Sequence, residues 1–278
     1  MNPEFKLSTV SGTTVQNPND LEDRSMNYPR KTVFAVGIST ALFAIACAQQ
    51  DTGTWAVHDM ERPQPPVVTA GTPSSATTVG TAPSDAIVLF DGRNLDAFRT
   101  GGGDASWKIK DGIAYVTKGD LHTRQDFGDC QFHLEWRVPA DFEGTGQNAG
   151  NSGIFFNDKY ELQILNGYEN ITYADGAGGG YYGQHPPLVN PCRPKGVWNT
   201  YDIIYTQPTW DADGTLVSPA RATVLYNGVL VQNNQAFTGT TVHGDTTSYG
   251  SAHGPGPIRI QEHTDPLQFR NIWVRPLP

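Results

Sequence analysis

The sequence predicts an all-β protein, a sandwich of two antiparallel sheets that is most simply a jelly roll. Short runs in which apolar and polar residues alternate recur from residue 85 to the C-terminus, as expected of strands with one buried face. Gly, Asn, Asp and Pro separate these runs, and no apolar pattern of helical period is long enough for a full helix. The chain shows no internal repeat, which disfavours a propeller or a solenoid.

Turn signals join several predicted strands into hairpins. Asp111-Gly112 and Asn227-Gly228 each divide two strand-like runs, and such dipeptides are the strongest short-range signal for a hairpin. Asp213-Gly214 predicts a further turn. The predicted strands lie at residues 85–92, 107–110, 112–117, 131–138, 152–156, 160–165, 201–206, 220–226, 229–232, 258–263 and 270–277.

Residues 26–47 have the pattern of a signal peptide. Two basic residues precede an apolar run that ends at Ala46 and is shorter than the ~20 residues that a membrane-spanning helix needs. A small residue followed by Cys47 resembles a bacterial lipobox, so we predict that Cys47 carries a lipid. Cleavage after Ala46 or Ala48 is the alternative. In both cases we expect the protein to leave the cytoplasm. It would then be a periplasmic or outer-membrane lipoprotein of the bacterial cell envelope, or a secreted protein.

Two other N-terminal segments are predicted to lie outside the folded domain. Residues 1–25 carry neither hydrophobic periodicity nor a targeting pattern, which indicates a non-native or misassigned extension with Met26 as the true first residue. Residues 48–84 are rich in Pro, Thr, Ser, Gly and Ala, which is typical of an extended tether. The folded domain is then expected at residues 85–278. The apolar side chains of the tether that could dock on it are Trp55, Met60, Val67 and Val68.

Charge and cysteine content restrict the partners and the covalent structure. The formal net charge is −9; residues 1–46 contain four Lys/Arg and four Asp/Glu, so 15 basic and 24 acidic residues remain after them. An acidic body argues against nucleic acid or anionic lipid as the main partner. Apart from Cys47, the cysteines are Cys130, in register with core-facing residues, and Cys192. A disulfide between them and a pair of free thiols are both open.

Two long loops interrupt the predicted strands. Residues 173–196 and 238–257 are rich in Gly, Pro and aromatic residues, and loops of this length in a compact domain usually carry function or lack order. The first loop contains Tyr181, Tyr182, Gln184 and His185, which can stack on a sugar and hydrogen-bond to it. We therefore predict a functional role for the first loop and leave the second open.

Polar side chains on three predicted strands could together form a site. They lie opposite the apolar face of residues 131–138, 160–165 and 258–263. If these strands neighbour one another in one sheet, they form a polar concave face able to hold a carbohydrate. A solvated outer face is the alternative, because any half-exposed antiparallel strand has a polar side. The side chains are His133, Glu135, Arg137, Glu161, Gln163, Arg259, Gln261 and His263.

Motifs for several other chemistries are missing from the sequence. There is no GxSxG elbow, P-loop, HExxH or EF-hand loop, and no Cys/His cluster with zinc spacing. The E-x-D-x-x-E strand of laminarinase-type glycosidases is also missing, since residues 160–165 carry a single carboxylate. The sequence therefore does not predict a retaining mechanism with two carboxylates.

Nine characteristic segments follow one another along the chain, namely "IVLFDGRNLDAF", "FHLEWRV", "GNSGIFF", "YELQIL", "YYGQHPPLVN", "VWNTYDIIY", "ARATVLYNGVLVQ", "GPIRIQEH" and "FRNIWVRPL". This series, in this order, resembles the 3-keto-disaccharide hydrolase family of secreted bacterial proteins. The resemblance covers about residues 85–278 and implies a concanavalin/laminarinase-like jelly roll, in agreement with the strand pattern. The sequence departs from the family at Asn166 and Glu262, where the family often has Asp.

The resemblance implies action on glycosides whose C3 hydroxyl a separate sugar 3-oxidoreductase has oxidised to a ketone. The ketone acidifies the C2 proton, so one base can remove it, the C1 group leaves by β-elimination, and hydration of the enone completes a net hydrolysis. Such a reaction needs one base, one proton donor and a group that polarises the ketone oxygen. A divalent metal ion could polarise this oxygen, with His263 and either Glu161 or Glu135 as ligands.

The resemblance also suggests a role for individual residues. Glu161 is expected to be the catalytic base or a metal ligand, and His263 an acid/base group or a ligand. Substrate contacts are expected from Gln163 and Gln261, with further contacts from Glu135, Asn151, Tyr182 and Arg270. For Arg270 a structural role in the last strand is equally open. A non-catalytic carbohydrate-binding module of the same fold, tethered to the cell surface, is the alternative function, because a fold does not decide an activity.

Overall fold

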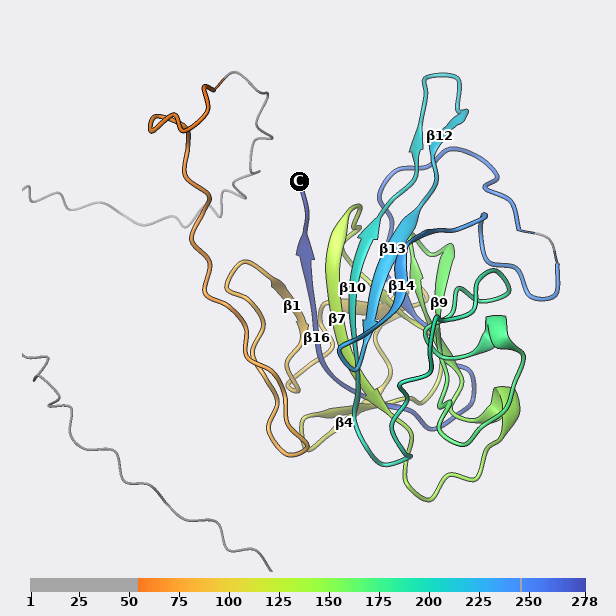
Figure 1. The fold of residues 1–278 in the computed structure, drawn as a ribbon. Helices are drawn as coiled ribbons and strands as arrows, with labels where there is room; N and C mark the ends of the chain where they lie inside the picture. The colour runs from red at the N-terminus through yellow and green to blue at the C-terminus, as the bar shows by residue number, and fades with distance from the viewer. Residues whose placement is uncertain (1–54, 246) are drawn as a thin grey trace, which may run out of the picture. The chain divides into compact units, whose positions relative to one another are not determined.

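The computed structural model describes residues 55–245 and 247–278, which consist of strands, turns and loops (Figure 1). Within these ranges the helical structure is limited to the short 3-10 turns Gly146–Asn148 and Ala174–Gly176. No helix of the described part is long and apolar enough to cross a membrane. The predicted extension at 1–25 and the predicted signal segment with Cys47 lie outside the described residues.

The larger of the two main sheets has eight antiparallel strands. They are β1 (Ile87–Phe90), β4 (Lys108–Lys110), β5 (Ile113–Tyr115), β7 (Cys130–Arg137), β10 (Asn199–Thr206), β13 (Arg221–Tyr226), β14 (Val229–Ala236) and β16 (Gln268–Pro276). Their order is β14-β13-β10-β7-β16-β5-β4, and β1 pairs with β16.

The second sheet has six antiparallel strands, and these carry the candidate active site. They are β2 (Phe98–Thr100), β3 (Gly103–Asp104), β6 (Leu121–Thr123), β8 (Ser152–Phe156), β9 (Tyr160–Ile164) and β15 (Arg259–Ile260), in the order β3-β2-β6-β15-β8-β9. A separate two-stranded ribbon is formed by β11 (Thr209–Trp210) and β12 (Leu216–Ser218). The all-β sandwich predicted from the sequence is confirmed.

The predicted hairpin turns are present, and their backbone conformation explains the residues used. Asp111 and Gly112, between β4 and β5, have φ values of 52° and 75°. Asn227 and Gly228, between β13 and β14, have φ values of 52° and 78°. Two successive positive φ values are those of a type I′ turn, which Asn-Gly and Asp-Gly favour. The strands missed from the sequence, such as β3 and β11, are two or three residues long and too short to show alternation.

The core lies between the two main sheets and is built from the predicted apolar faces. Phe132, Leu134 and Trp136 of β7 and Leu162 of β9 are at most 1% exposed, and burial of each such side chain contributes about 1.5–3 kcal/mol. Cys130 joins this core as expected. Its thiol and that of the half-buried Cys192 are free, so the disulfide alternative is not realised.

Part of the predicted tether packs on the larger sheet. We call residues 69–84 the strap; it is a small hairpin in which Thr72 and Thr81 form an isolated antiparallel bridge. The Ser74 hydroxyl donates a hydrogen bond to Glu135, and Arg270 Nη2 donates one to the Ser75 carbonyl at 2.6 Å. The strap docks through polar groups, whereas the four apolar side chains named as able to dock are exposed, from 39% for Trp55 to 98% for Val67.

Candidate active site

A pocket of about 240 Å3 opens on the outer face of the six-stranded sheet. Strands β8, β9 and β15 form its floor, and the loops 173–196 and 238–257 contribute to its walls. Its volume lies just below the ~300–1,000 Å3 usual for ligand pockets, which suits a ligand the size of one ring. The lining residues are Asn151, Phe155, Glu161, Tyr182, Thr241, His243, Arg259, Gln261 and His263.

Strand register brings the floor residues together. Phe155 on β8 pairs with Glu161 on β9 on one side and with Arg259 on β15 on the other. These three residues lie directly opposite one another across neighbouring strands, and their side chains therefore share the outer face. On each strand, the residues immediately before and after these three point into the core, as the alternation predicts.

Glu161 is a buried carboxylic acid that faces the pocket. The residue is 5% exposed, and within the described part of the chain no donor hydrogen-bonds its carboxyl group. Burial raises the pKa of Glu161 to about 8, and the nearby positive charge of Arg259 acts in the opposite direction. A carboxylate that is poorly solvated and titrates near neutral pH is suited to act as a general base and then to return the proton.

Arg259 places a fixed positive charge in the same pocket. Its Nη1 lies 2.9 Å from Oδ2 of Asp120, its Nε donates to Oδ1 of Asp158, and its guanidinium carbon lies 3.5 Å from the centre of the Phe155 ring. The two carboxylates and the ring hold the guanidinium in one orientation. A preorganised cation of this kind can stabilise an oxygen on which negative charge develops.

The two long loops contribute hydroxyl and imidazole groups to the walls. The Glu161 backbone N–H donates to Thr241 Oγ1 at 3.1 Å, and the Thr241 N–H donates to the Lys159 carbonyl at 2.9 Å, so the second loop is attached to β9. The Tyr182 hydroxyl lies 2.9 Å from His243 Nδ1 and 2.6 Å from the Tyr173 hydroxyl. Burial raises the pKa of Tyr182, so its phenol is a proton donor at neutral pH.

Asn151, Gln261 and His263 complete the pocket. The Asn151 side chain donates to the Gln147 carbonyl at 2.8 Å, and its backbone N–H donates to buried Asp265 at 2.7 Å. The Gln261 N–H donates to the Gly153 carbonyl at 2.9 Å, which attaches the chain after β15 to β8. His263 is exposed. Five predicted site residues therefore line one pocket, namely Asn151, Glu161, Tyr182, Gln261 and His263.

Three other predicted site residues lie elsewhere. Gln163 is fully buried, and its Nε2 donates to Gln147 Oε1 at 3.2 Å and to the Gly176 carbonyl at 3.3 Å. Glu135 and Arg270 belong to β7 and β16 of the other sheet. The condition for one shared polar face therefore holds for two of the three strands, because residues 131–138 belong to the other sheet, where β7 pairs with β10 and β16.

Phe155, Thr241 and His243 were not predicted as site residues, and Arg259 was placed on a polar strand face without an individual role. Alternation already places Arg259 on the polar face of its strand, and this was the available signal for it. The position of Phe155 follows only from the pairing of β8 with β9 and β15. Thr241 and His243 lie in a loop without local periodicity, so only the tertiary structure shows them.

The metal site suggested by the resemblance has few donors here. The described residues contain no group of three or more His, Cys, Asp or Glu side chains placed to share a metal ion. Glu161 and His263 both line the pocket, whereas Glu135 lies in the other sheet. A bound metal ion therefore stays a prediction, in which Glu161 and His263 would be the two ligands from this chain.

Comparison with known proteins identifies the family. Residues 85–275 match the 3-keto-alpha-glucoside-1,2-lyase-like domain. A crystallised "putative glycosyl hydrolase" from Parabacteroides distasonis is 46% identical, with a TM-score of 0.75 over 80% of this chain and 97% of that chain. A second protein of that description and organism is 19% identical, with a TM-score of 0.50 over 69% of this chain and 99% of that chain, and supports the fold alone. No curated protein matches. Since the family match spans more than half of its length, the chain belongs to the family of 3-keto-alpha-glucoside-1,2-lyase-like domains.

Proposed function

We propose that this protein cleaves glycosides whose sugar carries a ketone at C3. The observation that carries the proposal is the buried carboxyl group of Glu161, with a pKa of about 8, facing a pocket that also holds the fixed cation of Arg259. Family membership and the 46% identical relative support the same class of reaction. A mechanism with one base accounts for a pocket in which Glu161 is the only carboxylate among the described lining residues.

The proposed reaction begins with proton transfer from C2 of the sugar to the Glu161 carboxylate. The electron pair of the C2–H bond forms a C2–C3 double bond, and the C3 oxygen becomes an enolate that Arg259 stabilises. The enolate then expels the C1 substituent by β-elimination, and the leaving oxygen takes a proton from His263 or Tyr182. Water then adds across the enone, with its oxygen bonding to C1 and a proton returning to C2, which completes a net hydrolysis.

The cellular setting is a further part of the proposal. The pattern at residues 26–47 supports export and a lipid on Cys47. The ketone substrate requires a separate oxidoreductase that oxidises the C3 hydroxyl, because no redox step occurs in the elimination itself. Carbohydrate is therefore the expected ligand of the protein.

The test is the release of aglycone from a 3-keto-glucoside by the full chain, followed by NMR with and without a chelator. Release is expected to fall by about 10²–10⁴-fold in Glu161→Gln, the range usual for loss of a general base, and to fall also in His263→Ala. Glu143→Gln, a change of an exposed carboxylate outside the pocket, is the matched control. Release that is absent from the native protein, or undiminished in Glu161→Gln, contradicts the mechanism. Saturable binding of intact glycans without turnover would instead favour the non-catalytic module.

A further inference from the structure

A second hollow, of about 450 Å3, lies between the strap and the outer face of the eight-stranded sheet. The strap contributes Thr72, Ser74 and Thr81, and strands β7, β10 and β16 contribute the floor. The candidate active site lies on the outer face of the other sheet, so the two hollows share no lining residue and can be altered separately.

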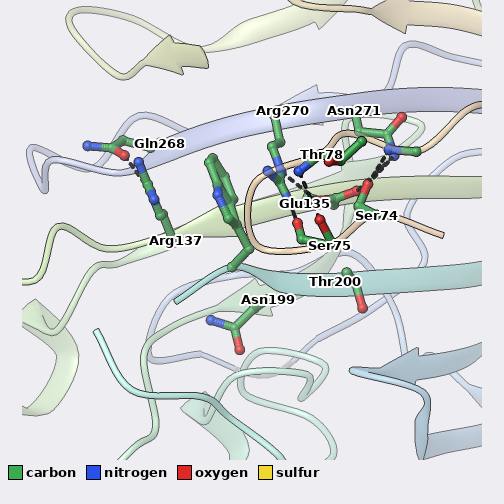
Figure 2. Close-up of polar contacts among 12 residues, drawn as sticks. Ser74, Ser75, Thr78, Glu135, Arg137, Asn199, Thr200, Gln268, Arg270 and Asn271 are labelled. Atoms are coloured by element: carbon green, nitrogen blue, oxygen red, sulfur yellow. Dashed lines mark hydrogen bonds and ion pairs between the residues drawn. The ribbon is translucent and has the colours of Figure 1, made fainter. Parts of the chain in front are cut away.

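The floor of this hollow contains a fully paired charge (Figure 2). Glu135 Oε2 accepts from Arg270 Nε at 2.7 Å, and Oε1 accepts from Asn271 Nδ2 at 2.8 Å and from the Ser74 hydroxyl. Arg270 also donates to the Ser75 carbonyl, and its guanidinium carbon lies 4.3 Å from the centre of the Trp198 ring. These contacts hold the strap in place and leave no net charge on the floor for a ligand to neutralise.

The wall contains a second balanced pair. His133 Nδ1 lies 2.7 Å from Asp202 Oδ1, and the imidazole stacks on the Trp273 indole with ring centres 5.0 Å apart. Burial lowers the pKa of His133, but hydrogen bonds to Asp202 and Glu135 outweigh it and raise the pKa to about 9. At neutral pH the imidazolium therefore balances the Asp202 carboxylate. The remaining charged side chain of the lining is Arg193, which is exposed and donates from Nη1 to the Trp198 carbonyl at 2.7 Å. Solvent screens this exposed charge, so the hollow does not select strongly for either sign of charge.

Other polar groups in the hollow are unused. The Gln131 amide, the Thr200 hydroxyl and the Trp273 indole N–H line it, and none of them is hydrogen-bonded to the described part of the chain. Such groups are satisfied by water when the hollow is empty, and a ligand with several hydroxyl groups can replace that water without loss of hydrogen bonds. Two proline rings, Pro73 and Pro83, offer apolar surface for the C–H groups of the same ligand, whereas the Trp273 indole is largely buried and stacked on His133.

We propose that this hollow is a second carbohydrate-binding site, which takes a neutral sugar through hydroxyl contacts and the apolar surface of two proline rings. Its volume of about 450 Å3, against about 240 Å3 for the Glu161 pocket, accommodates the end of an oligosaccharide. The strap forms one wall of the hollow. Because the strap is residues 69–84, this wall lies outside residues 85–275, which match the family. The site binds glycan independently of cleavage and keeps the protein close to glycan while the other face carries out the reaction.

The test is calorimetric titration of the full chain with maltose and with cellobiose. Thr200→Trp fills the hollow with an indole, and Thr206→Trp places the same residue on the same strand at an exposed position outside the hollow. We expect Thr200→Trp to weaken disaccharide binding at least about tenfold, or ~1.4 kcal/mol, and Thr206→Trp to leave it unchanged. Thermal unfolding of both variants shows whether the fold is kept, and Gln131→Ala, which only removes an amide, is the milder second variant.

Three results overturn the proposal. They are the absence of saturable binding of both disaccharides, equal binding by native protein and Thr200→Trp, and saturable binding of glucuronate in place of the neutral sugars. Aglycone release from a 3-keto-glucoside, measured on the same variants, separates this proposal from the proposed function. Release is expected to be unchanged in Thr200→Trp. If no variant releases aglycone while Thr200→Trp still loses disaccharide binding, the proposed function fails and the second site stands.

Discussion

Gly153 on β8 leaves the space that the carboxyl group of Glu161 occupies on the neighbouring strand β9. A Cβ atom at position 153 would lie 2.5 Å from Oε1 of Glu161 and 2.9 Å from Cε2 of Phe155. Real Cβ atoms do not approach other atoms this closely, so any larger residue must move the carboxyl group or the ring. The orientation of the proposed base therefore depends on a glycine of the adjacent strand.

Gly153→Ala is expected to reduce kcat/KM for a 3-keto-glucoside by about 10²-fold, the effect typical of displacing a catalytic group by about 1 Å. The strand can keep its pairing, because the clash involves side-chain atoms and not the backbone. Steady-state kinetics measures the change. Gly102→Ala is the matched control, since a Cβ atom there would meet nothing within 4 Å. Equal activity of the two variants would refute the role of Gly153.

The pH dependence of activity should report the ionisation of Glu161. Burial raises the pKa of this carboxyl group to about 8. Below that pH the group is a neutral acid and cannot accept the C2 proton, so kcat/KM should rise with pH and level off above about pH 8. A rate profile between about pH 5 and 10 tests this, and the residual rate of Glu161→Gln should lack the same rise. A profile that is already level at about pH 6 argues against Glu161 as the base.

Arg259→Gln tests the stabilisation of the enolate. Loss of one preorganised charge at a developing oxyanion typically lowers kcat by about 10²–10³-fold, and we expect a smaller loss in Arg259→Lys, which keeps the charge. The effect should fall on kcat more than on KM, because the charge on the oxygen develops only during the reaction. Arg93→Gln, at a side chain that is 83% exposed, is the control. An effect on KM alone would assign Arg259 to substrate binding.

Glu135→Gln should destabilise the protein without directly affecting the Glu161 pocket. Removing one partner of a buried ion pair leaves Arg270 uncompensated and costs about 3–5 kcal/mol. Urea unfolding followed by tryptophan fluorescence measures this loss. Glu169→Gln, on an exposed carboxylate, should change stability by less than about 0.5 kcal/mol. If Glu135→Gln instead abolishes turnover in a fully folded protein, then Glu135 acts in the reaction after all.

The same network predicts how stability depends on pH. Burial alone would raise the pKa of Glu135, but hydrogen bonds from His133, Ser74 and Asn271 outweigh it and hold the pKa at about 2. Its contribution is present above its ordinary pKa of 4.5 and is lost as the pH falls towards 2. The pKa of His133 is raised, so its contribution is present below 6.5 and is lost as the pH rises through about 9.

Stability should therefore be highest between about pH 4.5 and 6.5 and decline on both sides. Urea midpoints across this range measure it. Glu161→Gln is the suitable background, because the raised pKa of Glu161 means that its ionisation between about pH 4.5 and 8 also lowers the stability of the folded state. A midpoint that still increases above about pH 7 would show that His133 is not held as an imidazolium.

The positions of Glu161 and Gln163 show how far sequence reasoning reaches within one strand. Alternation correctly placed both side chains on the non-core face of residues 160–165. It could not tell that the loop 173–196 covers Gln163 and leaves Glu161 facing a pocket. Loop coverage depends on contacts between segments far apart in sequence, such as the hydrogen bond from Gln163 to the Gly176 carbonyl.

The sequence by itself determined the longer strands, the turns at Asp111-Gly112 and Asn227-Gly228, and the face on which the residues of those strands lie. These features depend on local backbone preferences and on the two-residue period of a strand. Only the tertiary structure decided which polar faces meet. Glu135 and Glu161 have the same local pattern, yet one lies under the strap and the other in the candidate active site. The physical reason is that strand partners are set by long-range pairing and packing, which alternation along a single strand does not encode.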